Sequence, residues 1–356
     1  MSNPTTTAPE VLSDRQGAVL RALVGAYVGE AGPVGSRMVS HLLPESLSAA
    51  SIRNTLVELA ELGLVDKPHA SAGRVPTERG LRLFVDRLLE PEQLADYERR
   101  SIAYSVGEAD ADGVVHVASQ LLSESTQQLG FVVAPRVDRL VLRHVSLVRL
   151  SSDRLLVVLV SQSGEAHRRV IEAARGLDQP LLDRAASLLS ERAAGRTLRE
   201  LRDLLAREAR AGRHKASRLL RLVVDLGTRA LEAEEGAPVD LVIATRLSLL
   251  AQPEFHDPRR VRDLFETVET KERLLEVLDG VIEGTGVFIT FGDEVDDPGL
   301  RRCALVATHY GSGDAPLGAL GVIGPSRMDY RRIVPLVEYF SQLITEKLSA
   351  SPPVGR

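Results

Sequence analysis

Apolar residues recur at helical spacing through the first ninety residues of the chain, in short stretches separated by turn residues. The first stretch follows Ser13, a residue type favoured at a helix N-terminus, and ends before Gly32-Pro33. A second, shorter stretch follows Ser36, and a third follows Ser48 and ends before Gly63, where a glycine can adopt the positive φ of a helix C-terminus. Three short helices joined by tight turns predict a helix-turn-helix.

The third predicted helix has a polar face opposite its apolar stripe. At 100° per residue, placing Ile52, Leu56 and Leu59 inward turns Ala50 and Asn54 outward, with Ser51 and Arg53 beside them. Asparagine can pair with adenine and arginine with guanine in the major groove, so this face predicts a recognition helix. Taken alone, the same pattern is equally typical of a solvated helix surface.

The segment after this helix decides between the two interpretations. A strand begins at Leu64-Val65, and a glycine-containing turn then runs from Lys67 to Arg74, before Thr77 begins another helix. A cationic turn directly after a recognition helix predicts a wing that contacts the DNA backbone or minor groove. The residues predicted to contact DNA are Ser36, Arg37, Ser48, Ala50, Ser51, Arg53, Asn54, Thr55, Lys67, His69, Ser71 and Arg74.

The middle of the chain changes from helical to strand-like patterning. Helical spacing over 114–129 is followed by three predicted strands, 139–150, 154–162 and 166–172, whose short polar turns are typical of hairpins. The apolar run Leu155 to Val160 is continuous, which predicts a strand covered on both faces.

A helical block then separates these strands from a second group. It lies between Gly176 and Gly236, and it is rich in Ala, Arg, Leu and Glu, so it is interpreted as an insertion. Residues 239–279 are again predicted to be helical. They are followed by strands at 286–291, 303–309 and 317–323 and by a last helix at 331–347. The predicted division is a tail at 1–12, a DNA-binding domain at 13–90, a linker at 91–112, an α/β domain at 113–175 and 237–348, an inserted domain at 176–236, and a tail at 349–356.

Composition restricts the class of protein. A length of 356 residues with 44 % apolar and 26 % charged residues predicts two or three globular domains. The longest uncharged run, Ala315 to Ser326, has 12 residues, which is too short to span a membrane. Residues 1–12 carry no positive charge and no apolar block, so we expect no secretory signal, and a single cysteine is typical of a reducing cytoplasm.

The charge balance favours base contacts over non-specific attraction to DNA. The whole chain carries a net charge of −5, and residues 13–90 hold nine Lys and Arg against nine Asp and Glu. The segment from Leu64 to Arg87 is weakly positive, with five cations and three acids. We therefore expect modest affinity for random DNA.

Other candidate chemistry is weak. The eight histidines show no metal-ligand spacing, and no nucleophile motif surrounds Cys303, so no metal, cofactor or catalytic site is predicted. Cys303 lies in an apolar strand and is interpreted as a core residue. The run from Arg327 to Tyr330 either contacts a ligand or caps the final helix, and we favour capping because polar turns before helices usually cap them.

Four segments resemble the heat-inducible transcription repressors of the HrcA type. They are Pro33–Arg37, Leu47–Asn54, Lys67–Thr77 and Gly321–Tyr330, and the resemblance extends over about residues 13–348. The pairing of these N-terminal and C-terminal motifs is highly specific. Lys67 and Ala70 depart mildly from the expected polar residues.

The resemblance implies an α+β protein with an N-terminal winged helix-turn-helix, then a GAF-like α/β-sheet domain interrupted by an inserted, mainly helical dimerisation domain. It also implies a cytoplasmic homodimer that represses chaperonin and DnaK-type chaperone operons by binding double-stranded DNA at an inverted-repeat (CIRCE) operator. The operator is released on heat stress, and the chaperonin is an implied partner that helps the repressor into its active form.

Three alternatives stay open from the sequence. The GAF-like domain could sense a small-molecule effector, which a cavity with converging polar groups would favour. The winged helix could serve only protein contacts. The chain could also be an enzyme with a regulatory winged helix, which the lack of a catalytic constellation disfavours.

Overall fold

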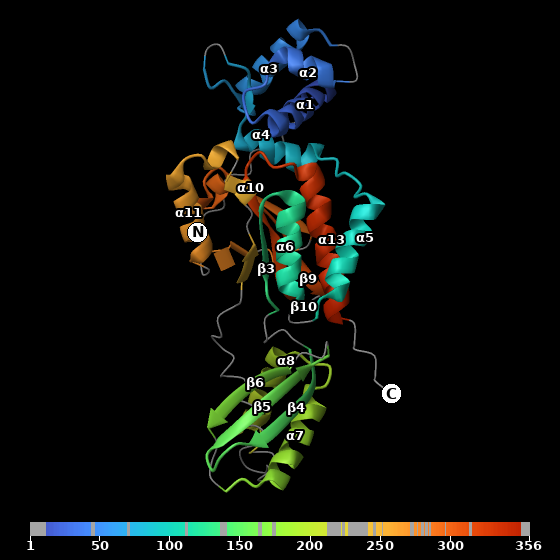
Figure 1. Cartoon of the computed structure of the whole chain (residues 1–356), viewed down its shortest axis with the longest axis vertical. Helices are drawn as coiled ribbons and strands as arrows, with labels where there is room; N and C mark the ends of the chain where they lie inside the picture. Colours follow the sequence, from blue (N-terminus) through green and yellow to red (C-terminus); the bar gives the residue numbers. More distant parts are fainter. Residues whose placement is uncertain are drawn as a thin grey trace.

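The molecule consists of three units arranged along its longest axis (Figure 1). The computed structural model describes residues 12–43, 47–69, 72–110, 113–135, 141–162, 166–172, 176–211, 222, 225–226, 241–244, 247–250, 252–270, 274–275, 277–278, 281, 284, 286–295, 297–312 and 315–349. We call 12–90 the N-terminal unit, 141–226 the distal unit, and the rest the central unit. Helix and sheet are mixed, as an α+β fold requires.

The N-terminal unit contains four helices and a two-stranded hairpin. Helices α1 (Asp14–Glu30), α2 (Ser36–Leu42) and α3 (Ala49–Glu61) are followed by strands β1 (Val65–Asp66) and β2 (Val75–Pro76) and by α4 (Glu78–Leu83), which continues as the π-helical turn η1 (Phe84–Leu88). Ser13 caps α1 in a capping box with Gln16, as its spacing predicted. The expected cap of α2 was wrong by one position: Gly35 is the N-cap, and Ser36 is the first helical residue.

The central unit is built on a five-stranded antiparallel sheet. Its order is β7 (Leu241–Ala244), β3 (Leu129–Val133), β10 (Ala315–Pro325), β9 (Cys303–Ser312) and β8 (Val287–Phe291). Helices α6 (Val114–Thr126) and α13 (Tyr330–Ser349) cover one face, and α5 (Asp96–Glu108) packs on α13. Helices α10 (Leu247–Leu250) and α11 (Pro258–Glu269) share the core on the other side with the 3-10 turns η3 (Pro253–Phe255) and η5 (Pro298–Leu300), and the 3-10 turn η4 (Gly292–Glu294) follows β8.

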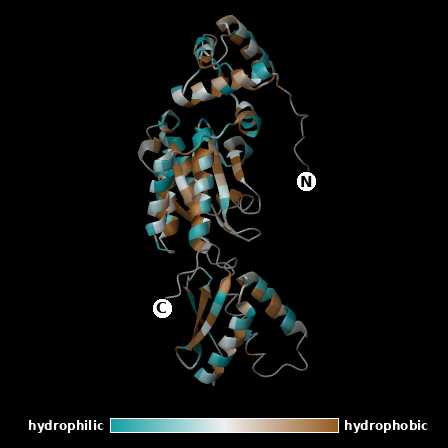
Figure 2. Cartoon of the chain, turned by 90° about the vertical axis from the view of Figure 1, so that its right-hand side faces the viewer, coloured by the Kyte–Doolittle hydropathy of each residue, from teal (hydrophilic) through white to brown (hydrophobic). Residues whose placement is uncertain are grey.

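Alternate residues of the central strands enter two separate cores. Val132 packs with α6 and α13, whereas Phe131 and Val133 pack with the α11 side. Figure 2 shows the hydrophobic colouring concentrated in these strands, between helices with hydrophilic outer faces. A sheet buried on both faces is therefore rigid, and it provides the support on which the N-terminal unit rests.

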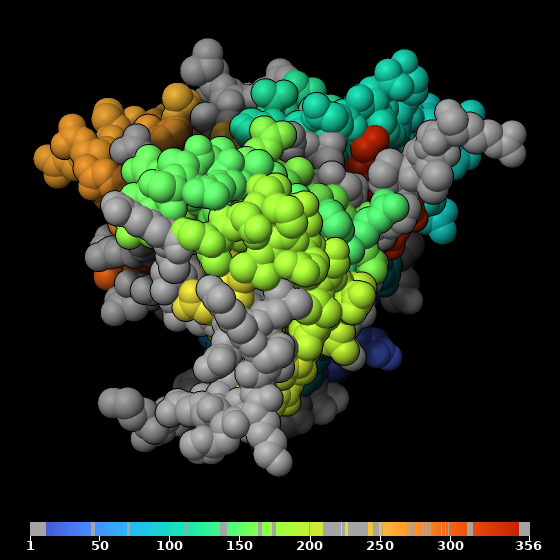
Figure 3. Space-filling model, turned by 90° about the horizontal axis from the view of Figure 1, so that it is seen from below, coloured from blue at the N-terminus to red at the C-terminus, as the bar shows by residue number. Residues whose placement is uncertain are grey.

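The distal unit has its own sheet and its own core. Strands β4 (Leu142–Arg149), β5 (Arg154–Ser161) and β6 (Ala166–Glu172) form an antiparallel sheet, with α7 (Gln179–Ala193) packed on β4 and α8 (Leu198–Ala211) beside α7. The buried cluster that joins them contains no described residue of the central sheet. Seen from below, the green and yellow-green residues of this unit occupy the end of the molecule (Figure 3).

This arrangement corrects the sequence-based division at 113–175 and 176–236. The three strands between 142 and 172 belong with the helices of the distal unit, and the central sheet instead contains β3 and β7. Strand β7 lies in the segment 239–279 that was predicted to be helical, and β3 follows the predicted helix 114–129 in a stretch to which no element was assigned. The run from Leu155 to Val160 is not covered on both faces, because burial alternates along β5. Its second apolar face is half-exposed. Within the described part of the chain, no helix is both long and apolar enough to cross a membrane.

Candidate nucleic-acid interface

Helix α3 presents one face to the core of the N-terminal unit and the other to solvent. Ser48 accepts a hydrogen bond from the backbone N–H of Ser51 (3.1 Å), which fixes the start of the helix as predicted. Ile52 is 0 % exposed and Leu59 is 0 % exposed, so the predicted inward stripe is confirmed. The exposed positions are Ala50, Arg53, Asn54, Val57 and Glu61, and Ser51 is half-buried.

Thr55 does not belong to the outward face. Its side chain is fully buried, and its hydroxyl donates to the carbonyl oxygen of Ser51 at 3.3 Å within the same helix. Thr55 follows Ile52 by three residues, a spacing that returns to the same side of a helix. Its inclusion among the DNA contacts was therefore wrong, and it is a core residue.

The acidic residue of α3 that is nearest in sequence to Arg53 and Asn54 is turned away from the exposed face. Glu58 forms an ion pair with Arg15 of α1 (3.2 Å), and its second oxygen accepts a hydrogen bond from the side chain of Gln16 at 3.0 Å. Arg53 and Asn54 make no side-chain hydrogen bond or ion pair with a described residue. The N-terminal half of α3 thus offers a free cation and a free amide, at the helix end where the macrodipole is positive.

The hairpin β1–β2 is held against the start of α2 by the backbone. Val65 pairs with Pro76 and Asp66 with Val75, and Arg74 then pairs with Val34 through two N–H···O bonds of 2.8 Å. Val34 lies between α1 and α2, so it adds a third extended segment beside the hairpin.

Gly73 makes this close approach possible. A Cβ built at Gly73 would lie 2.4 Å from the carbonyl oxygen of Val34, and the obstructing atoms are backbone, which cannot move aside. The sequence signal for this contact was the glycine itself, between two cationic residues.

The hairpin carries the remaining predicted contacts. Lys67 and His69 are exposed and Arg74 is half-exposed, whereas Ser71 lies outside the described residues. On α2, Ser36 is half-buried and Arg37 is exposed. Neither Arg37, Lys67 nor Arg74 forms an ion pair with any residue that the structure describes. The structure therefore places four unpaired cations, including Arg53, on α2, on the outer face of α3 and on the hairpin.

Three exposed apolar side chains on α2 and α3 were missed from the sequence. Met38 is 37 % exposed, Leu42 is 54 % exposed and Val57 is 43 % exposed. Val57 follows Asn54 by three residues and Arg53 by four, so it continues the same exposed stripe. Apolar groups at such positions can contact thymine methyl groups. The available signal was their spacing, which does not match that of the buried stripe.

The N-terminal end of α4 stabilises the base of the hairpin. Thr77 accepts from the backbone N–H of Gly80 (3.0 Å) and donates to the carbonyl oxygen of Gly63 at 2.7 Å. Gly63 has φ of +69°, as predicted for a residue that ends a helix. The positions of α3, the hairpin and α4 are thus fixed by short-range polar contacts.

The N-terminal unit is joined to the central unit by arginines. Arg327 forms a two-bond ion pair with Glu254, with Nη2 to Oε2 at 3.0 Å, and its Nη1 donates to the carbonyl oxygen of Val28 in α1 at 3.1 Å. Arg82 pairs with Glu294 and lies over the ring of Phe291, 4.9 Å from its centroid.

The run from Arg327 to Tyr330 also caps the last helix. The hydroxyl of Tyr330 donates to the carbonyl oxygen of Ser326 (2.7 Å), burial raises its pKa well above the ordinary value, and the carbonyl of Asp329 accepts from the N–H of Ile333. These contacts support the capping interpretation of the run. The structure adds a contact to α1 through Arg327 that sequence alone did not predict.

No group of three metal-ligand side chains is present among the described residues. Burial raises the pKa of the Cys303 thiol to about 12, with a further contribution from nearby Glu254 that Arg260 opposes. A thiol with that pKa stays protonated at neutral pH, so it is a poor nucleophile.

Comparisons with known proteins converge on one family. Residues 112–334 match the family described as HrcA protein C terminal domain. The heat-inducible transcription repressor HrcA of Mesorhizobium japonicum is 39 % identical over 348 residues, which cover 96 % of this chain and 96 % of the relative. The repressor of the same name from Geobacter sulfurreducens is 35 % identical over 339 residues and covers 95 % of this chain and 98 % of its own.

A solved structure matches the whole fold. It is titled as the crystal structure of a hypothetical protein, with a TM-score of 0.63 and 25 % identity, and the match covers 96 % of this chain and all of that chain. The arrangement of the three units therefore has a counterpart in an experimental structure.

Proposed function

The chain belongs to the HrcA family of heat-inducible transcription repressors, and from this premise we propose that its N-terminal unit is a winged helix-turn-helix that binds double-stranded DNA. The relatives are named as transcription repressors and not as enzymes, so the chain is a regulatory protein without catalytic activity. In this proposal α3 is the recognition helix, and the hairpin β1–β2 is the wing.

One observation carries the proposal. The N-terminal half of α3 exposes Arg53 and Asn54 without described partners, while the nearby acid Glu58 is held by Arg15. An exposed guanidinium without a protein partner is weakly hydrated and therefore available for a planar acceptor, and no described contact of the unit requires it at this position. A groove that offers purine acceptors gives both side chains bidentate partners, with arginine on guanine and asparagine on adenine.

The surrounding cations suit the DNA backbone. Arg37 on α2 and Lys67 and Arg74 on the hairpin flank the recognition helix in sequence and carry no described counter-ion. Contacts of this type position a protein on the duplex without reading its sequence. His69 extends the same set at the hairpin and Ser36 adds a hydroxyl on α2, whereas Ser51 is assigned to the bases together with Arg53 and Asn54.

Substitution of Asn54 tests the assignment of base contacts. Asn54→Ala should weaken binding to an inverted-repeat operator by about 1–3 kcal/mol and leave binding to scrambled DNA nearly unchanged. Fluorescence anisotropy on the two duplexes measures both affinities. Equal losses on operator and scrambled DNA would reject the base-reading role.

Two further variants separate base contacts from backbone contacts. Glu61→Gln, on the same exposed stripe but two turns further along α3, should leave the ratio of specific to non-specific affinity unchanged. Arg74→Ala should weaken binding to both duplexes. It should also lower the slope of log affinity against log salt concentration by about one. An unchanged slope would remove Arg74 from the phosphate contacts.

We further propose that the repressor is a homodimer, assembled through the open face of the distal sheet. Leu156 of β5 pairs with Val148 of β4 and Val170 of β6, so these three side chains form one apolar row. Val148 is 41 % exposed and Val170 is 53 % exposed. Two copies of this face related by a two-fold axis would bury it and present two recognition helices to a palindrome.

Release on heating then follows from the separate core of the distal unit. Its buried cluster shares no described residue with the central sheet, so it can lose structure as a unit of its own. Loss of the dimer face would leave each N-terminal unit with one half-site and much weaker binding. A cytoplasmic location and help from the chaperonin stay predictions that the family resemblance implied.

A further inference from the structure

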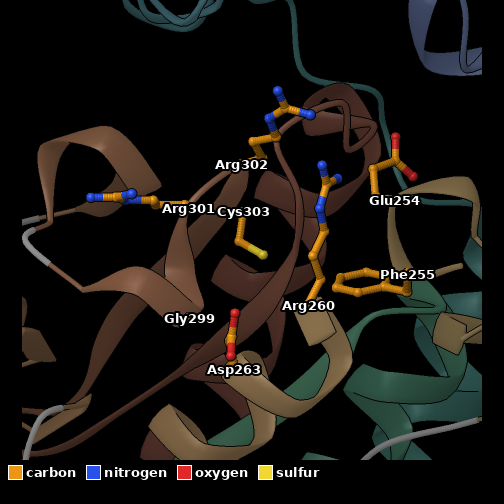
Figure 4. Close-up of a pocket in the computed structure, with 8 residues that line it drawn as sticks. All are labelled: Glu254, Phe255, Arg260, Asp263, Gly299, Arg301, Arg302 and Cys303. Atoms are coloured by element: carbon orange, nitrogen blue, oxygen red, sulfur yellow. The ribbon is translucent and has the colours of Figure 1, made fainter. Parts of the chain in front are cut away.

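A cavity of about 300 Å³ opens on the central unit between α11, η3 and the start of β9. Three arginines line it: Arg260 in the first turn of α11, and Arg301 and Arg302 immediately before β9. Two carboxylates, Glu254 and Asp263, lie at its other sides. Figure 4 shows Arg260 and Arg302 rising in the same direction beside Cys303, whereas Arg301 extends to the side opposite Glu254.

The charges of this cavity are unbalanced. None of the three arginines forms an ion pair with a residue that the structure describes. Glu254 is already bound by two nitrogens of Arg327, so among the described residues that line the cavity Asp263 is the one carboxylate left as a counter-charge. Like charges that line one small concavity repel each other unless an anion lies between them.

The floor of the cavity is inert. Cys303 is 5 % exposed, and burial together with Glu254 raises its pKa to about 12, while Arg260 acts in the opposite direction. A protonated thiol and the ring of Phe255 offer apolar contact and no nucleophile, so the chemistry is binding and not catalysis.

We propose that this cavity binds a small molecule that carries a phosphate or carboxylate group, held between Arg260 and Arg302. Guanidinium groups bind both oxyanions through paired N–H···O bonds. Asp263 accepts a hydrogen bond from a hydroxyl or amine on the remainder of the molecule. A volume of about 300 Å³ is at the lower end of small-molecule sites and excludes a polymer from the interior.

The site is directly connected to the N-terminal unit. Glu254 lines the cavity and also holds Arg327, which donates to the carbonyl oxygen of Val28 near the end of α1. Burial raises the pKa of Tyr27, the residue before Val28, and Glu254 raises it further, whereas Arg327 and Arg302 lower it. A bound molecule that moves the Glu254 carboxylate therefore acts, through Arg327, on the contact between the two units.

The binding step is tested without DNA, because it does not rest on the proposed DNA-binding function. Calorimetric titration of the full chain with pyrophosphate, inorganic phosphate and malonate should show saturable binding to at least one of them, in the millimolar range or tighter. Preference for pyrophosphate would identify a phosphate ester, and preference for malonate would identify a carboxylate. No saturable binding of any of the three would overturn the proposal.

Substitutions of the lining arginines test whether the oxyanion binds in this cavity. Arg302→Ala and Arg260→Ala should each weaken binding about tenfold or more, because each removes a charge-assisted contact. Arg262→Ala, an exposed arginine on the same helix that does not line the cavity, should change it less than twofold. Equal losses in all three variants would mean general charge attraction and overturn the site. Thermal unfolding of each variant establishes that the chain still folds.

Hydrogen exchange tests the connection from the cavity through Arg327 to the end of α1. Pyrophosphate should change amide hydrogen exchange at Tyr27 to Ala31 in the parent chain and not in Arg327→Ala. Unchanged exchange in the parent chain at saturation would overturn the transmission to the N-terminal unit. Loss of operator binding in Arg260→Ala and Arg302→Ala, with no oxyanion binding in the parent chain, would assign these arginines to the DNA backbone instead.

Discussion

The substitution Gly73→Ala should separate the hairpin β1–β2 from Val34, because it adds a methyl group where the two backbones meet. Gly73→Ala places a Cβ 2.4 Å from the carbonyl oxygen and 2.5 Å from the carbonyl carbon of Val34, and these backbone atoms cannot rotate aside as a side chain could. The hairpin must therefore retreat, and the two 2.8 Å hydrogen bonds between Arg74 and Val34 are lost. Each such bond contributes about 1 kcal/mol net, so about 2 kcal/mol separates the attached hairpin from the detached one.

This cost should appear in DNA affinity. If the attached hairpin is the DNA-competent form, restoring it on binding weakens operator affinity by roughly 30-fold, the equivalent of about 2 kcal/mol. Anisotropy titration on the operator measures the loss. The control is Gly25→Ala, an exposed position in α1 where a Cβ meets nothing within 4 Å. It should leave affinity unchanged and stabilise the helix by about 0.5–1 kcal/mol. If Gly73→Ala bound the operator as tightly as the parent chain, the hairpin would not be part of the interface.

Three further outcomes are expected. Thr55→Val should leave operator affinity within about twofold, because the side chain is buried and bonds only its own helix, and a tenfold loss by the same titration would return Thr55 to the interface. Cys303 should resist Ellman's reagent at pH 8 in the native chain and react in urea. The free energy of unfolding should also fall as the pH rises from 9.0 toward 12, where only the unfolded chain loses this proton, and urea titration of Cys303→Ala should lack that part of the decrease. Val158→Asp, at the centre of the open distal face, should give a monomer by sedimentation, whereas Arg184→Asp on the exposed side of α7 should stay dimeric, and equal behaviour of the two would exclude this face as the interface.

The N-terminal unit was largely predictable because its signals are local. Ser13, Ser48 and Thr77 cap helices through atoms within three residues, and Gly63 ends one through its own φ angle. The outward face of α3 followed from helical geometry, except that buried Thr55 was included and exposed Val57 was missed. The ion pair of Glu58 with Arg15 joins residues 43 positions apart, and no periodicity reveals such a contact.

The sheets could not be assigned from the sequence, for a different reason. Strand β3 has five residues and follows directly after a helix, so its apolar run has too few positions to distinguish a strand from one more helical turn. Its partner β10 lies about 190 residues further along the chain, with Leu320 opposite Val132. The three consecutive hairpin strands 142–172 were correctly identified, but which helix covers them depends on the long-range packing of α7 on β4.

A substitution in the core of the distal unit should change the temperature at which the operator is released, although this unit does not contact DNA in the proposal. Ile171 is 6 % exposed in the distal core, and Ile171→Val removes one methylene at a cost of about 1 kcal/mol. For a unit of this size, that loss lowers the unfolding midpoint by about 4–8 °C. If unfolding of this unit opens the dimer, the temperature at which operator is released should fall by the same amount, while affinity at low temperature stays that of the parent chain. Calorimetry and operator binding against temperature measure the two midpoints. An earlier melting of the distal unit with an unchanged release temperature would place the heat-sensitive step elsewhere, and the contacts of Arg327 and Arg82 between the N-terminal and central units would then be the elements to vary.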